Sequence, residues 1–255
     1  SPYVHDVSAF TDGTHTAAVR ATDNAGNQAE ASTSFYLDKT APTDVQITDA
    51  PDTWINQTVQ TTVSLSFSAD CGVSGLKQYQ LSVDSGSFFD AGTTGSYVLT
   101  VSSLSDGLHT VVVHAIDNAD NVSSEASTTL QLDQTPPLTF VPTADPATYT
   151  NAATIAIAFS TTDATSDVAR YDVAVDSGLY ATQTSIYALP TAGLTDGSHI
   201  VHVKAVDLAG NERICDVTIL IDKSAPSLAI VSVTQAGGPN LLSGSWSVAG
   251  DVTIV

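Results

Sequence analysis

The sequence predicts an all-β protein, folded as tandem immunoglobulin-like β-sandwiches in an elongated array. The first observation is an internal repeat: the acidic turn ATDNAGN at 21–27 returns as AIDNADN at 115–121 and as AVDLAGN at 205–211. The second is that strand-like stretches of alternating polarity flank these turns, whereas no stretch shows helical spacing with caps. Short strands, frequent turns and a repeat of roughly 90 residues are together typical of the immunoglobulin-type sandwich.

The strand before each acidic turn shows this alternation most clearly. In HTVVVHAID (109–117), Val111, Val113 and Ala115 alternate with residues of mixed polarity, and the other two copies repeat the pattern. One face is always small or branched and apolar, whereas the opposite face admits charge. Because successive side chains of a strand point to opposite sides, this pattern predicts an antiparallel strand with one face in a core.

An Asp-Gly turn precedes each of these strands, in TDGTH, SDGLH and TDGSH. The residue two positions after the glycine is a histidine in all three copies: His15, His109 and His199. Sandwiches of this type often place a tyrosine there, which bonds back across a corner. The sequence therefore predicts structural histidines. In the acidic turn, Gly26 and Gly210 are expected to adopt positive φ, and Asp120 takes the glycine's place in the second copy.

Three proline-containing joints divide the chain. They read Asp38-Lys-Thr-Ala-Pro, Asp133-Gln-Thr-Pro-Pro and Asp222-Lys-Ser-Ala-Pro, and their prolines favour stiff, extended links. The predicted units are the C-terminal half of one domain (1–42), two complete domains (43–137 and 138–226) and the N-terminal strands of a further domain (227–255). For the two partial domains, two explanations remain open: the chain is part of a longer array, or neighbouring chains supply the missing strands.

The charge balance narrows the classes of partner. The chain has 255 residues, with 27 Asp and Glu against 7 Lys and Arg, and a formal net charge of -20. Phosphate backbones and anionic membranes repel such a surface, so we expect no nucleic-acid partner. No apolar run approaches the roughly 18 residues of a membrane helix, so no membrane insertion of this segment is expected. The charge favours calcium as a partner, although solubility alone also explains it.

Two cysteines bear on the organisation of the chain. Cys71 and Cys215 fall in different predicted domains, which argues against a disulfide between them within one chain. Free thiols and pairing between molecules both remain open.

The motifs DGTHT, AVRATDNAGN and LDKTAP together resemble the Ig-like repeats of large bacterial surface adhesins and related cell-envelope proteins. The likeness covers essentially the whole chain, but Asp120 replaces the turn glycine and one joint ends Pro-Pro. It implies an extracellular rod, on a cell surface or secreted, in which acidic residues near the joints bind structural calcium. Similar repeats occur in S-layer proteins, filaments and secreted enzymes. The resemblance therefore narrows the class of protein but does not identify its function.

The topology of such a sandwich indicates which acidic residues share a joint. The strand after each Asp-Gly turn runs back to the pole where its domain begins, so one domain's joint meets the next domain's acidic turn. The predicted metal ligands are Asp38, Asp70, Asp117 and Asp120 at the first joint, and Asp133, Asp163, Asp167 and Asp207 at the second. Calcium binds six to eight oxygens, which carboxylates and carbonyls supply. Turn capping by the same aspartates is the alternative interpretation.

No catalytic function is expected, because Asp, Ser and His recur with the repeat and no Gly-rich phosphate loop, HExxH or CxxC motif is present. The predicted function is a structural rod stiffened by calcium. One alternative is a subunit of an extracellular filament or S-layer lattice, in which neighbouring copies of the chain exchange strands. The other is a set of accessory Ig-like modules of a secreted enzyme.

Overall fold

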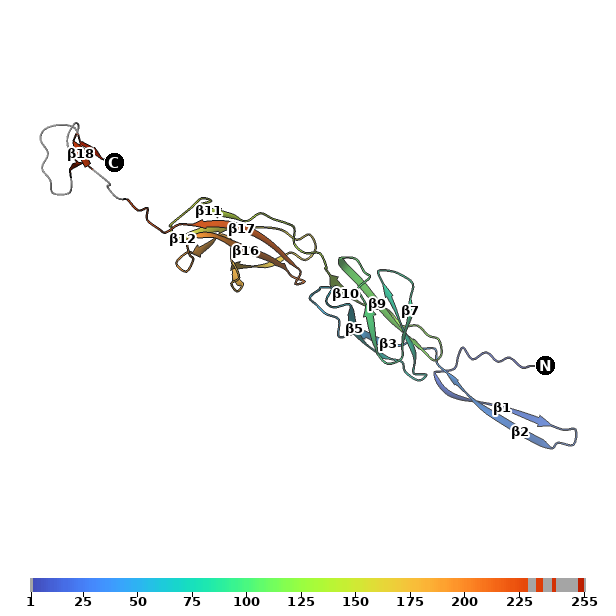
Figure 1. Ribbon diagram of the computed structural model, residues 1–255. Helices are drawn as coiled ribbons and strands as arrows, with labels where there is room; N and C mark the ends of the chain where they lie inside the picture. Colours follow the sequence, from blue (N-terminus) through green and yellow to red (C-terminus); the bar gives the residue numbers. More distant parts are fainter. Residues whose placement is uncertain (1, 229–232, 236–239, 242–251, 255) are drawn as a thin grey trace.

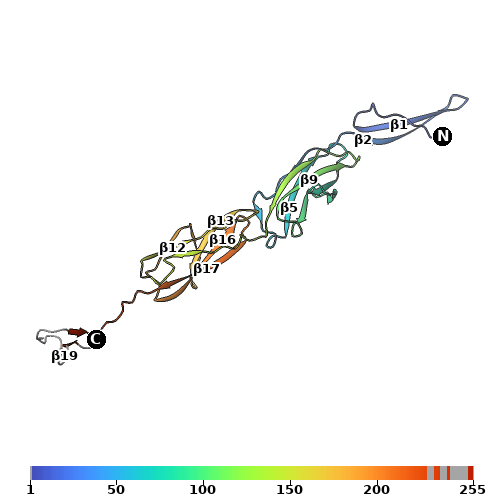
Figure 2. The same cartoon turned by 90° about the horizontal axis from the view of Figure 1, so that it is seen from above.

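The computed structural model describes residues 2–228, 233–235, 240–241 and 252–254, and this part of the chain is built from strands. No helix in it is long and apolar enough to cross a membrane. In Figures 1 and 2 a hairpin and two sandwiches follow one another end to end along an extended line. The predicted fold class, all-β with tandem sandwiches, is confirmed.

The first sandwich consists of a three-stranded sheet, in the order β3-β5-β8, and a five-stranded sheet, in the order β4-β10-β9-β6-β7. All pairs are antiparallel except β4 with β10. The strands are β3 (Thr43–Ile47), β4 (Trp54–Ile55), β5 (Thr62–Asp70), β6 (Leu76–Val83), β7 (Phe89–Gly92), β8 (Ser96–Thr100), β9 (Gly107–Asp117) and β10 (Ala126–Leu132).

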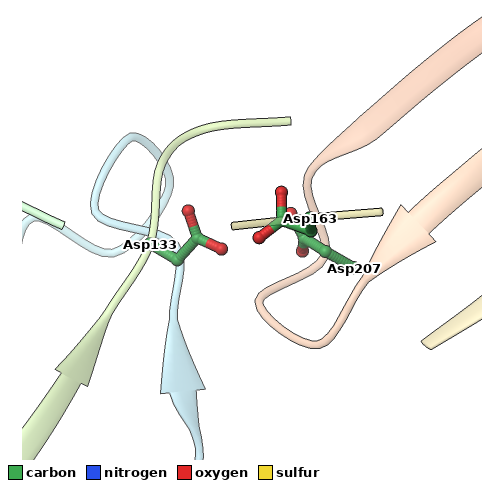
Figure 3. A group of neighbouring side chains, drawn as sticks. All are labelled: Asp133, Asp163 and Asp207. Carbon is green, nitrogen blue, oxygen red and sulfur yellow. The ribbon is translucent and has the colours of Figure 1, made fainter. Parts of the chain in front are cut away.

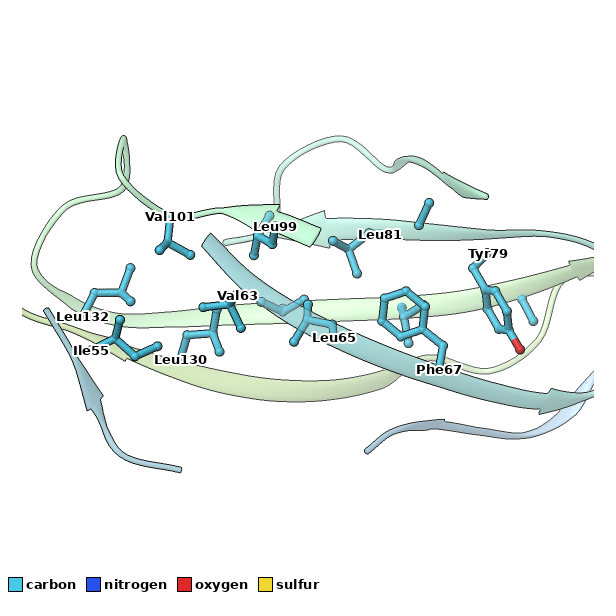
Figure 4. Close-up of a cluster of buried hydrophobic side chains, with 14 residues drawn as sticks. Ile55, Val63, Leu65, Phe67, Tyr79, Leu81, Leu99, Val101, Leu130 and Leu132 are labelled. Atoms are coloured by element: carbon cyan, nitrogen blue, oxygen red, sulfur yellow. The ribbon is translucent and has the colours of Figure 1, made fainter. Parts of the chain in front are cut away.

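The core of this sandwich lies between its two sheets, as Figure 4 shows. On β9 the buried residues Val111, Val113 and Ala115 are those that the alternation places on the apolar face. On β5, Val63 and Leu65 face them from the other sheet. Burying an aliphatic side chain of this size contributes about 1.5–3 kcal/mol, so the period-two pattern both selects the strand and stabilises the sandwich.

The second sandwich has the sheets β11-β12-β15 and β14-β13-β16-β17, and the counterpart of the β4–β10 pair is a single parallel bridge between Thr150 and Ile221. Its core draws on residues between Phe140 and Ile221, whereas the first core draws on residues between Val45 and Leu132. The domain boundaries themselves stay a prediction. The strands are β11 (Thr143–Asp145), β12 (Thr154–Ala158), β13 (Val168–Val175), β14 (Ala181–Gln183), β15 (Tyr187–Pro190), β16 (Gly197–Asp207) and β17 (Glu212–Ile221).

Strands also lie on either side of the two sandwiches. At the N-terminal side, β1 (Gly13–Thr22) and β2 (Gln28–Leu37) form an antiparallel hairpin around the first acidic turn. Most of the predicted unit 227–255 lies outside the described residues. Its described strands, β18 (Val233–Gln235), β19 (Asn240–Leu241) and β20 (Val252–Ile254), pair antiparallel around β18.

The acidic turns adopt one backbone conformation in all three copies. Gly26 and Gly210 have φ of 90° and 87°, and Asp120 has φ of 67°. The expectation of positive φ at this position is therefore confirmed. Asp tolerates the left-handed region better than most residues with a side chain, which explains how the second copy keeps the turn.

The corner histidines are structural, as predicted. Their Nε2 atoms lie 2.7, 2.8 and 2.9 Å from a carbonyl oxygen four residues earlier, in Thr11, Ser105 and Thr195 respectively. In the two sandwiches the other ring nitrogen also meets an acceptor: His109 Nδ1 lies 2.6 Å from Asp84 and His199 Nδ1 lies 2.7 Å from Asp176. Because both partners are acceptors, this arrangement favours the imidazole with a proton on both nitrogens, which is its positively charged form.

Candidate metal centre

Three aspartates converge at the joint between the two sandwiches. Asp133 follows β10 of the first sandwich, Asp207 ends β16 of the second, and Asp163 lies in the loop between β12 and β13. One carboxylate oxygen of each lies within 4.8 Å of the other two. Figure 3 shows the carboxylate of Asp133 pointing across the joint toward the other two. In the described part of the chain, no other group of three or more metal-ligating side chains lies close enough to share one ion.

All three carboxylates are buried, with 0%, 8% and 2% exposure for Asp133, Asp163 and Asp207. Each also caps a local turn, as the alternative interpretation predicted. Asp207 Oδ1 accepts the N–H of Asn211 at 2.8 Å, and Asp133 Oδ1 accepts the N–H of Thr135 at 2.9 Å. Capping therefore engages these aspartates, but it does not use all of their oxygens.

Capping leaves Asp133 Oδ2 buried and without a hydrogen bond, and the hydroxyl of Ser166, which lies near enough to Asp133 to affect its pKa, is likewise buried and unpaired. Four buried side-chain atoms of the described residues lack a partner, and Asp133 Oδ2 is the one that belongs to a carboxylate. A charged group buried without a partner costs more than a neutral one, and either a proton on the carboxyl or a bound cation removes that cost.

The electrostatics of the joint point the same way. Burial raises the pKa of Asp133, the nearby Ser166 hydroxyl and the Thr135 amide lower it, and the charges of Asp163 and Asp207 raise it, so that the pKa remains above its ordinary value. The three carboxylates repel one another in a site with little water. A divalent cation between them would make the net electrostatic interaction attractive. The donor set consists of oxygen atoms, which fits a hard cation such as calcium rather than a softer metal.

Direct hydrogen bonds between the two sandwiches frame the three carboxylates. Asn211, in the acidic turn, donates from Nδ2 to the carbonyl oxygen of Asp133 at 3.1 Å and to Asp207 Oδ2 at 2.9 Å. Asn56 Nδ2 donates to Asn211 Oδ1 at 2.6 Å, and Arg213 Nε donates to the carbonyl of Pro137 at 3.1 Å. The joint is thus packed and hydrogen-bonded around the carboxylates.

The first joint repeats the frame without the same acidic group. Asn121 Nδ2 donates to the carbonyl oxygen of Asp38 at 3.2 Å and to Asp117 Oδ2 at 2.8 Å. Asp117 is fully buried and caps its turn, as Asp207 does. Here, however, Asp38 Oδ2 accepts the N–H of Ser74 at 2.9 Å. Both oxygens of Asp38 therefore have partners in the protein.

The other predicted ligands lie apart from the three carboxylates. Asp70 is exposed and caps the N–H of Gly72. Asp120 is exposed and forms an ion pair with Lys77. Asp167 is exposed and takes φ of 64°, which makes it a turn residue of the same loop as Asp163. The structure therefore brings together three of the eight predicted ligands.

A second set of joint residues, the aspartates of the Asp-Gly turns, was not among the predicted site residues. Asp106 Oδ1 accepts the N–H of Gln134 at 2.9 Å, and its Oδ2 accepts the hydroxyl of Thr135. Asp12 and Asp196 make the same pair of contacts to 39–40 and 223–224. The signal was present, because every Asp-Gly turn is followed in the same copy by Asp, any residue, and Thr or Ser.

No family model matches the sequence, and no curated protein matches it. Among solved structures, fibronectin(III)-like modules of Clostridium thermocellum CbhA match with 15% identity over 70% of this chain and 94% of that one, at a TM-score of 0.40.

Two further matches concern adhesion proteins. A Ca2+-stabilized adhesin with which an Antarctic bacterium binds ice matches with 22% identity over 82% of this chain and 57% of that one, at a TM-score of 0.42. A tetra-tandem repeat from the extending region of a large adhesion protein matches with 23% identity over 98% and 72%, at a TM-score of 0.35. At these levels of similarity the matches carry no argument about the site or the function of this chain.

Proposed function

We propose that this chain is part of a non-catalytic, extracellular structural rod of a cell-surface adhesin or envelope protein, stiffened by calcium between its two complete sandwiches. The observation that carries the proposal is the buried Asp133 Oδ2, which has no hydrogen-bond partner and belongs to a carboxylate facing Asp163 and Asp207. Asp133 belongs to one sandwich and the other two aspartates to the next. A cation held by all three would therefore tie the orientation of one sandwich to the other.

Calcium is the cation that this donor set and setting favour. Carboxylate and carbonyl oxygens are its preferred ligands, and extracellular modules bind it at about 10⁻⁴–10⁻³ M. At that affinity calcium is a constant structural component outside cells rather than a signal. The formal net charge of -20 supports cations as partners and argues against nucleic acid.

The hydrogen bonds of the corner histidines support the proposal that the chain is non-catalytic. Both ring nitrogens of His109 and of His199 are engaged by a carboxylate and a carbonyl in their own sandwich. A general base needs a free nitrogen beside a nucleophile, and neither histidine offers one.

The test is a pair of thermal melts of the whole chain, in excess calcium and in chelator. A ligand at 100 times its Kd stabilises the folded state by about 2.7 kcal/mol, so we expect calcium to raise the melting midpoint. In Asp133→Asn the rise should disappear. This variant should also melt no lower than the wild type in chelator, because the substitution removes a buried repulsive charge.

Asp49→Asn is the matched control, because Asp49 is exposed and lies away from the joint. It makes the same change in charge and should keep the full calcium response. Superimposable melts of the wild-type chain with and without calcium would reject calcium stiffening. An equal response in wild type and Asp133→Asn would place the calcium elsewhere and reject this site.

A further inference from the structure

The two joints share one backbone frame, which allows their residues to be compared position by position. Leu76 pairs with Asp117 in the first sandwich, and Val168 pairs with Asp207 in the second. Counting back from these pairs, Ser74 corresponds to Ser166, two residues earlier, and Cys71 corresponds to Asp163, five residues earlier. The third carboxylate of the second joint is thus replaced by a thiol in the first.

The equivalent serine amides use different acceptors. In the second joint the N–H of Ser166 goes to Asp163 Oδ1, within its own loop, at 2.9 Å. In the first joint the N–H of Ser74 reaches across to Asp38 Oδ2, also at 2.9 Å. A thiol is a weak acceptor, so Cys71 does not compete for this amide.

This exchange of partners changes the two joints in opposite ways. Asp163 adds a carboxylate to its joint and accepts the Ser166 amide, and Asp133 Oδ2 is without a hydrogen bond. Cys71 adds no carboxylate and leaves the amide free to satisfy Asp38. One joint therefore has three carboxylates, of which Asp133 keeps a buried oxygen without a hydrogen bond. In the other joint Asp38 and Asp117 have, among the described residues, no third carboxylate beside them, and both oxygens of Asp38 accept backbone amides.

We propose that the residue at this loop position, Asp163 in one joint and Cys71 in the other, decides whether a joint binds a divalent cation or closes by a direct hydrogen bond. The inference rests on the proposed cation site at the second joint. It makes the first joint independent of calcium. Removing calcium would then loosen the rod between the two sandwiches and leave the joint between the hairpin and the first sandwich unchanged.

The experiment counts the calcium ions bound by the whole chain, by isothermal titration, in the wild type and in variants of this one position. Cys71→Asp should bind one ion more than the wild type, and Asp163→Ser one ion fewer. The double variant C71D/D163S should return to the wild-type number. Cys71→Asn is the matched control, because its side chain can accept the serine amide without adding charge, and it should add no ion.

A second readout uses the wild-type chain, so it does not depend on the folding of any variant. Amide hydrogen exchange of the loops 71–74 and 163–166 is compared in calcium and in chelator. We expect calcium to slow exchange in 163–166 and to leave 71–74 unchanged. Far-UV circular dichroism of each variant confirms that a changed ion count does not come from unfolding.

The outcomes separate this inference from the function on which it rests. If the wild type loses an ion in Asp163→Ser but Cys71→Asp gains none, the cation site stands and the switch is overturned. Calcium protection of 71–74 in the wild type also overturns the switch alone. If calcium protects neither loop and Asp163→Ser keeps the wild-type ion count, the proposed cation site fails, and the switch fails with it.

Discussion

Asp106, in the turn before β9, accepts the backbone N–H of Gln134, in the joint after β10, at 2.9 Å. Its second oxygen accepts the hydroxyl of Thr135. One side chain thereby fixes the direction in which the chain leaves the sandwich. The same relationship holds for Asp12 with Lys39 and for Asp196 with Lys223, so each copy of the repeat holds its own exit with an aspartate.

Removing this clamp should destabilise the first sandwich. Asp106→Ala loses both contacts, and a hydrogen bond to a charged group contributes about 1.5–3 kcal/mol, with the lower end expected for a partly exposed residue. Asp106→Asn keeps an oxygen for the amide and should cost less. Thermal melts of the two variants check the order. Equal melting midpoints for Asp106→Ala and the wild type would show that the clamp contributes nothing to stability.

The corner histidines make stability depend on pH. Burial alone would lower the pKa of His109, but its hydrogen bonds to Asp84 and Ser105 outweigh burial and leave the pKa raised. The hydrogen bond to Asp176 raises the pKa of His199, against the opposing charge of Lys223. A raised folded-state pKa gives stability that is fully present below the unfolded value of about 6.5 and is lost as pH rises through the folded value.

The aspartates that pair with these histidines set the lower pH limit of this stabilisation. Hydrogen bonds from His109 and His199 lower the pKa of Asp84 and Asp176, so their contribution is present above the unfolded value of about 3.9 and is lost as pH falls through the folded value. The two histidine–aspartate pairs should therefore contribute most to stability between about pH 4 and 6.5, and their contribution should decline toward pH 9.

Thermal melts from pH 4 to pH 9 in chelator test this dependence. His109→Gln together with His199→Gln should flatten the decline on the alkaline side. His5→Gln, which changes an exposed histidine, should leave the profile unchanged. An unaltered slope in the double variant would contradict the assignment of the decline to the corner histidines.

The acidic turn gives a prediction about backbone conformation. Gly210 has φ of 87°, and a Cβ added there would meet no atom within 4 Å, so the cost of Gly210→Ala is that of the left-handed conformation alone. That cost is about 1–2 kcal/mol. Gly193→Ala is the control, because its site is equally open and its φ is not in the left-handed region. Denaturant unfolding should show a loss for Gly210→Ala only.

The two cores predict separate unfolding of the two sandwiches. Leu65 is fully buried in the first core, so Leu65→Ala should cost about 2–5 kcal/mol there. In chelator, calorimetry should show one transition shifted and the other retained. Ile157→Ala should do the reverse, because Ile157 belongs to the second core. Val98→Ala, at an exposed site, should change neither. A single transition that shifts as a whole would contradict two independently folding domains.

Parts of the candidate site were predictable from the sequence. Once the repeat shows a sandwich, the joint of one domain must meet the acidic turn of the next, and Asp133 and Asp207 do come together. The same reasoning predicted a loop ligand at each joint, Asp70 at the first and Asp163 at the second. It did not show that only Asp163 lies beside the other carboxylates of its joint. Asp70 lies one residue before the position equivalent to Asp163, and in an extended segment neighbouring side chains point to opposite sides. One residue of offset therefore separates a buried carboxylate from an exposed one.

The sequence by itself determined the class of fold, the repeat, the apolar faces of the strands and the positive φ of the acidic turn, because each follows from local periodicity or from backbone sterics. Only the tertiary structure decided which oxygen each amide meets. The N–H of Ser166 goes to Asp163 and that of Ser74 goes to Asp38, across a joint. A donor satisfies one strong acceptor at a time, so the acceptor left over, Asp133 Oδ2, becomes visible only when all the partners are in place.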